Sequence, residues 1–96
     1  IVTESLFSMD GDIAPLKEIA QVAEKWGALF VVDEAHATGI FGKRGSGLVE
    51  HFSLSEQVFA TIHTGGKALG VGGAWIAGSK ALKNYLVHIH LSNVKI

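Results

Sequence analysis

Apolar and polar positions in the first third of the chain predict a strand, a helix and a second strand. Residues 1–3 form a short apolar strand candidate, and residues 16–26 carry apolar side chains at helical spacing with charged residues between them. Asp12 is the expected N-cap of this helix, and Gly27 stands where a helix C-terminal glycine belongs. Residues 28–32 are five consecutive apolar residues. Such a run after an amphipathic helix predicts a strand buried on both faces, and therefore a βαβ unit.

The rest of the chain predicts two further strands and a second long helix. Residues 58–62 and 74–77 are short apolar runs that favour strands, and residues 48–52 suit a single helical turn. Ser79 is a suitable cap for the second helix. Residues 87–96 have weak patterning. We therefore predict an α/β fold, with a mostly parallel sheet and flanking helices.

Composition restricts the possible functions. The 96 residues suffice for one small domain, and eight basic against nine acidic residues give no basic face for nucleic acid. The absence of cysteine excludes disulfides and thiolate metal sites and fits a cytoplasmic protein, and the five histidines show no metal-binding spacing. The apolar runs are shorter than the roughly 20 residues of a membrane span, so no membrane partner is expected. Because the chain opens on a strand without an initiator methionine, we expect an internal piece of a longer protein.

Polar side chains follow each predicted strand at the point where it ends. Ser8 follows the first strand, Asp33 and His36 follow the second, and Thr64 and Lys67 follow the third. In open α/β sheets, ligands bind beyond the carboxyl ends of the strands. If the three strands are parallel, these five residues gather at one edge of the sheet.

Each of these residues has a functional and a plain interpretation. Asp33 either binds a protonated ligand nitrogen or caps the following turn, and His36 is either a ligand contact or a solvated loop histidine. Thr64 either reaches a phosphate beside the glycine N–H groups or is an ordinary strand-end hydroxyl. Glu34 is expected to point away from Asp33 in a structural role. At its usual pKa near 10.4, only about one lysine in a few thousand is neutral at pH 7, so a nucleophilic Lys67 needs burial or nearby cations. The alternative is a surface lysine on a glycine-rich hairpin.

Two nucleotide-binding motifs are partly matched. Gly66-Lys67 looks like the end of a P-loop, but Thr61 and Ala68 stand where that motif needs glycine and Ser or Thr. Residues 33–36 spell the DEAH box of helicases at a strand end. A P-loop could lie upstream of Ile1, so a DEAH-type ATPase stays open as an alternative of another class.

Three ordered segments resemble one enzyme family. Residues 7–12, 32–39 and 64–70 resemble the α-oxoamine synthases, which are fold-type I enzymes that depend on pyridoxal 5'-phosphate (PLP). The resemblance covers residues 1–86. It implies that these residues are part of a PLP-binding large domain, and it leaves residues 87–96 as a tail of unclear origin.

The resemblance also implies roles for the five residues. Lys67 would form a Schiff base with the cofactor aldehyde and would later act as an acid and base. Asp33 would bind the pyridine nitrogen, His36 and Ser8 the phenolic oxygen, and Thr64 the phosphate. The implied reaction is the decarboxylative condensation of an amino acid with an acyl-CoA, in a homodimer. Family members that use glycine as the amino acid stay open as alternatives.

Some family features are missing from the chain. The ring-stacking histidine, an upstream phosphate loop and the small C-terminal domain of the family are absent, so we expect the isolated chain to be inactive. Gly65 stands where the family has a bulkier residue, which is expected to loosen the cofactor loop.

Overall fold

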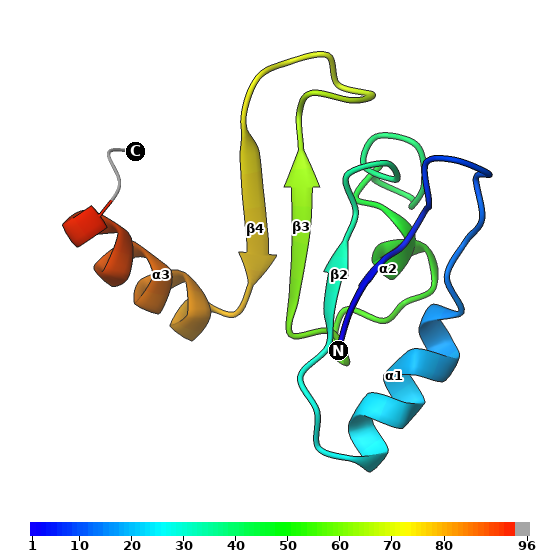
Figure 1. The fold of residues 1–96 in the computed structure, drawn as a ribbon, viewed down its shortest axis with the longest axis horizontal. Coiled ribbons are helices and arrows are strands. Elements are labelled where there is room, and N and C mark those ends of the chain that lie inside the picture. Colours follow the sequence, from blue (N-terminus) through cyan, green and yellow to red (C-terminus); the bar gives the residue numbers. More distant parts are fainter. Residues whose placement is uncertain (94–96) are drawn as a thin grey trace.

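The computed structural model describes residues 1–93, which form a four-stranded sheet with helices (Figure 1). The elements in chain order are β1 (Val2–Glu4), α1 (Leu16–Lys25), β2 (Val31–Asp33), α2 (Leu48–His51), β3 (Ala60–Thr64), β4 (Ala74–Gly78) and α3 (Lys80–Asn93). The strand order is β1-β2-β3-β4, with β1, β2 and β3 parallel and β4 antiparallel to β3. The predicted α/β fold with a mostly parallel sheet is confirmed.

The register decides which side chains share a face of the sheet. Val32 pairs with Thr61, and Thr61 pairs with Ala77. Because side chains alternate along a strand, His63 lies on the same face as these three residues. The opposite face carries Asp33, Ile62 and Thr64, since Asp33 pairs with Ile62.

The hydrophobic core lies between the two helices α1 and α2 and the face of the sheet that carries Val32. Its buried members are Ala14, Leu16, Ala20, Ala23, Phe30, Val32, Ala37, Leu48, Val49 and Leu54. Burial of apolar side chains at about 25 cal/mol per Å² is the main source of stability for such a layer. The core therefore fixes β2 against α1 from one side.

The two ends of α1 differ in how well the sequence predicts them. Gly27 has a φ of 60°, and the N–H of Ala28 returns to the carbonyl of Ala23 at 2.8 Å, so the C-terminal glycine is confirmed. The predicted cap at Asp12 is wrong: the helix begins after Pro15, without a side-chain cap. The Asp12 carbonyl instead accepts a bond from an N–H across its own loop.

The second strand is shorter than the apolar run that predicts it. β2 begins only at Val31, and Leu29 is 61% exposed, so burial on both faces from residue 28 is wrong. Residues 28–30 connect the end of α1 to the sheet. Of these three apolar residues, Phe30 is buried in the core.

Two further element boundaries differ from the predicted ones by one or two residues. Trp26 is 74% exposed, since the helix ends one residue before it and leaves it outside the apolar face. β3 begins at Ala60, two residues later than predicted, because the N–H of Val58 still bonds the carbonyl of Leu54 in the preceding turn.

The last helix begins as predicted. The Ser79 hydroxyl accepts a bond from the Leu82 N–H at 3.1 Å, and the Ser79 carbonyl accepts one from the Lys83 N–H at 3.0 Å. The helix continues past residue 86 to Asn93, so part of the weakly patterned tail is helical, and residues 94–96 lie outside the described residues. Within residues 1–93, no helix is long and apolar enough to cross a membrane.

Candidate cofactor site

The carboxyl ends of the three parallel strands lie at one edge of the sheet, at the top of Figure 1. Asp33 ends β2 and Thr64 ends β3. Ser8, His36 and Lys67 lie in the connections that follow β1, β2 and β3. The predicted arrangement of these strand ends is therefore present. Whether all five side chains bind one ligand stays a prediction.

The connection after β1 is a short closed loop. Its first backbone bond ties it to β2, since the Ser5 N–H donates to the Asp33 carbonyl at 2.9 Å. The Phe7 N–H then donates to the Asp12 carbonyl, also at 2.9 Å, which closes the loop around Ser8. Ser8 is exposed, and its hydroxyl bonds no other part of the described chain.

Asp33 caps the following turn and keeps one carboxylate oxygen for another partner. Its Oδ1 accepts a bond from the Ala35 N–H at 2.9 Å, so the turn-capping interpretation is correct. The side chain is half-buried, and Oδ2 has no hydrogen bond within residues 1–93. The cap holds the carboxylate in place and leaves Oδ2 for a ligand.

Glu34 has a structural role, as predicted. It is fully buried, and its two oxygens accept bonds from the N–H groups of Leu48 at 3.0 Å and Val49 at 3.1 Å. A side chain at Gly47 would overlap this carboxylate, and Gly47 also has a φ of 117°. The second acid of the DEAH-like segment therefore faces the start of α2 instead of the strand-end edge.

The loop between β2 and α2 is closed by a second carboxylate. Glu50 accepts bonds from the Arg44 N–H and from Arg44 Nε, each at 2.8 Å. These bonds from Arg44 lower the pKa of Glu50. His36 lies just before this loop, in a turn where the N–H groups of Ala37 and Thr38 bond the Glu34 carbonyl. His36 is half-buried, and its ring has no partner among the described residues.

The glycine-rich loop after β3 is closed by its own backbone. The Thr64 hydroxyl accepts a bond from the Gly66 N–H at 3.2 Å. The Gly65 N–H donates to the Gly73 carbonyl, and the Val71 N–H donates to the Gly65 carbonyl. A Cβ at Gly65 would lie 2.8 Å from Val71 Cγ2, so Val71 takes the space that a larger residue would need. Whether a glycine at this position loosens the cofactor loop stays a prediction.

Lys67 lies in this loop, exposed on a β-hairpin. β3, β4 and their connection form the hairpin that the alternative interpretation expected. The Lys67 ammonium has no hydrogen bond or ion pair within residues 1–93. The described part of the chain thus gives it neither the burial nor the neighbouring cation that a nucleophilic amine needs.

His63 is the buried polar residue that sequence reasoning missed. It is 5% exposed, and burial lowers its pKa despite the opposing charges of Glu34 and Asp33. Its ring bonds Thr38 and Thr61 and stacks on Trp75. The only signal in the sequence is the alternation of Thr61 and His63 along a strand, which places both on one face.

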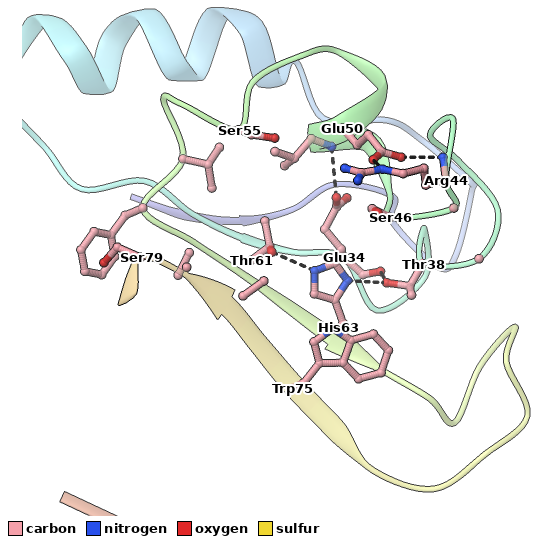
Figure 2. A pocket seen from close by; sticks show the side chains of 18 of the residues that line it. Glu34, Thr38, Arg44, Ser46, Glu50, Ser55, Thr61, His63, Trp75 and Ser79 are labelled. Atoms are coloured by element: carbon pink, nitrogen blue, oxygen red, sulfur yellow. Dashed lines mark hydrogen bonds and ion pairs between the residues drawn. The ribbon is translucent and has the colours of Figure 1, made fainter. Parts of the chain in front are cut away.

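A hollow lined by both polar and apolar side chains lies beside His63 on the helix-bearing face of the sheet, and Figure 2 shows its walls. Its polar lining includes Glu34, Thr38, Glu50 and Thr61, and Trp75 lies against the His63 ring. None of the five predicted site residues lines this hollow. The strand-end edge and the hollow are therefore separate features.

Comparison with known proteins decides the family. Residues 1–93 match the profile of the family described as aminotransferase class I and II. The chain belongs to this family. It is 51% identical over 88 residues to the 8-amino-7-oxononanoate synthase of Alkaliphilus metalliredigens, which covers 92% of this chain and 22% of that protein. The family match replaces the DEAH-type ATPase alternative.

Solved structures of the family share the fold. The 8-amino-7-oxononanoate synthase of Francisella tularensis is 32% identical with a TM-score of 0.78, over 91% of this chain and 25% of that one. A structure of SPT with PLP as an internal aldimine is 41% identical with a TM-score of 0.80, over 86% of this chain and 21% of that one. The chain spans about a fifth of the length of the curated relatives. The resemblance to fold-type I enzymes is confirmed.

Proposed function

We propose that this chain is the lysine-bearing part of a PLP-dependent acyltransferase of biotin synthesis. The reaction joins L-alanine to pimeloyl-CoA, forms 8-amino-7-oxononanoate, and releases CO2 and CoA. The main support is 51% identity, over 92% of the chain, to a protein of that name. Since the chain spans 22% of that relative, the activity belongs to a longer protein that includes it.

One structural observation carries the cofactor proposal. Asp33 and Thr64 end neighbouring parallel strands on the same face of the sheet, and Lys67 follows three residues after Thr64. A carboxylate and a hydroxyl thus lie at the edge where α/β sheets bind ligands, and an amine lies in the loop that follows.

The side chains at this edge match the polar groups of PLP. Asp33 suits a protonated ring nitrogen, and Thr64 suits a phosphate. Ser8 and His36 are donors for a phenolic oxygen, and the Lys67 amine suits an aldehyde. When bound, PLP supplies an electron sink for the carbanion formed at the amino acid.

Asp33 acts by electrostatics. A carboxylate beside a nitrogen base favours the protonated form of that base, because opposite charges attract most strongly at short distance. The bond from the Ala35 N–H to Oδ1 fixes the Asp33 carboxylate, so Oδ2 can hold a proton on the ring nitrogen without reorientation.

Lys67 acts by covalent attachment and by proton transfer. Its amine would hold the cofactor aldehyde and, when free, would move a proton at the α-carbon of the amino acid. The loop closed between Gly65 and Val71 limits where the amine can go. In this proposal the rest of the longer protein buries Lys67.

The test is product formation by the longer protein. Incubation with L-alanine and pimeloyl-CoA is expected to yield 8-amino-7-oxononanoate and one CoA per product, measured by mass spectrometry and thiol release. Glycine and L-serine are tested in place of L-alanine. Faster turnover of glycine would instead indicate a glycine-using member, such as 5-aminolevulinate synthase or 2-amino-3-ketobutyrate CoA ligase. No CoA release with any of the three amino acids would contradict acyl transfer from pimeloyl-CoA.

A further inference from the structure

His63 connects two segments that flank the predicted cofactor site. It lies on β3 one residue before Thr64, and its Nδ1 is 2.8 Å from the hydroxyl oxygen of Thr38 in the turn after β2. Its Nε2 is 2.8 Å from the hydroxyl oxygen of Thr61 on its own strand. The ring stacks on Trp75, with centroids 5.3 Å apart and planes at 9°. Figure 2 shows the ring between the two threonines, over the indole.

The neighbours of the ring decide where its proton lies. The Thr38 hydroxyl is 2.7 Å from the Glu34 carbonyl, which can only accept, so Thr38 donates there. Thr38 must then accept from His63, which places the ring proton on Nδ1. Nε2 of the neutral ring is left as an acceptor and takes the proton of the Thr61 hydroxyl. Both nitrogens of a neutral His63 are thus satisfied.

The bond from His63 to Thr38 lies beyond the end of the strand ladder. The ladder between the two segments closes with the Glu34 N–H on the Ile62 carbonyl at 2.7 Å. Past that point, within the described chain, the bond from His63 to Thr38 is the only hydrogen bond between residues 35–47 and residues 61–73. The same segments also approach each other at Gly39, where an added Cβ would lie 3.3 Å from Ala68 Cβ.

We propose that His63 is a positioning residue for the cofactor site. Its neutral ring holds the turn that carries His36 at a set distance from the strand and loop that carry Thr64 and Lys67. This inference rests on the proposed function, because it concerns the same site. Functional side chains have to be held within about 0.5 Å, and a displacement of about 1 Å can cost about 100-fold in rate.

Two threonine variants separate positioning from simple stability. Thr38→Val and Thr61→Val each keep the side-chain shape and leave one buried nitrogen of His63 without a partner, so both are expected to lower the melting temperature. Only Thr38→Val breaks the link between the two segments, since Thr61 lies on the same strand as His63. Thr38→Ser keeps the hydroxyl and is the rescue variant.

The measurements use the longer protein that contains this chain. PLP affinity is measured by titration of the cofactor-free protein, and backbone hydrogen exchange of residues 35–40 is measured without PLP. Thr38→Val is expected to weaken PLP binding about tenfold and to speed exchange, because it removes the hydroxyl that bonds both His63 and the Glu34 carbonyl. Thr38→Ser and Thr61→Val are expected to bind PLP within about threefold of wild type.

The outcomes distinguish this inference from the proposed function. Normal PLP binding by wild type together with unchanged binding by Thr38→Val would overturn the positioning role alone. Equal weakening by Thr61→Val and Thr38→Val would also overturn it, because the cause would then be lost stability. A wild-type protein that binds no PLP would overturn the proposed function and this inference together.

Discussion

At the scale of single residues, the loop that carries Lys67 depends on a glycine without room for a side chain. A Cβ at Gly65 would lie 2.8 Å from both Cγ2 and the carbonyl oxygen of Val71. Gly65→Ala therefore has to displace the loop, and we expect PLP affinity to fall about tenfold or more. Gly72→Ala in the same loop is the matched control, because a Cβ there meets nothing within 4 Å. Equal affinity of the two variants would contradict this role of Gly65.

The buried His63 makes the stability of the protein depend on pH. Burial lowers its pKa below the usual 6.5, so the unfolded chain takes up this proton at a higher pH than the folded chain. The contribution of His63 to stability is complete above pH 6.5 and falls as the pH drops through the folded-state pKa. Denaturant unfolding of the longer protein between about pH 8 and pH 5 measures this pH dependence. His63→Gln is expected to lose less of its free energy of unfolding as the pH falls. An identical dependence on pH in both proteins would contradict the prediction.

Sequence reasoning predicted the positions of the polar residues at the strand ends better than the role of the buried His63. Asp33, Thr64 and Lys67 follow apolar runs, so their positions at strand ends could be predicted from the pattern alone. His63 could not, because its importance depends on Thr38, which is 25 residues away in sequence and reaches it only in the fold. The capping bond of Asp33 likewise depends on local backbone geometry.

At the scale of elements, α2 is attached to the sheet through one buried carboxylate. Glu34→Gln replaces an acceptor oxygen with an NH2 group that faces the N–H of Leu48 or Val49. An unpaired buried donor costs about 1–3 kcal/mol, so we expect the free energy of unfolding to fall by about that amount. Glu56→Gln, at an exposed position, is the control with no expected change. Equal stability of both variants in urea would contradict this role of Glu34.

The elements themselves could be predicted in type, and their ends could not. Residues 28–32 predict a strand because of their apolar run, but β2 occupies only its last part, since the chain needs residues 28–30 to return from α1. Asp12 has the side chain of a good cap, yet it is held in the loop that closes around Ser8. Tertiary contacts of this kind override local preference.

At the scale of the whole molecule, the chain exposes the apolar side chains of its last strand. Every residue of β4 is exposed, with Trp75 at 44% and Ile76 at 52%. We predict that the isolated 96-residue chain forms no measurable 8-amino-7-oxononanoate, because Lys67 is exposed to solvent and the chain spans about a fifth of the length of the curated relatives. Measurable formation of 8-amino-7-oxononanoate by the isolated chain would contradict this. The expected homodimer of the longer protein stays a prediction.

Covalent trapping at Lys67 tests the central claim most directly. The longer protein is incubated with PLP, reduced with borohydride, digested and analysed by mass spectrometry, with Lys67→Ala treated in parallel. We expect the phosphopyridoxyl label on Lys67 in wild type and no stoichiometric label in Lys67→Ala, because borohydride fixes PLP on the lysine that holds it. A full label on another lysine, or undiminished labelling of Lys67→Ala, would show that the strand-end edge is not the cofactor site.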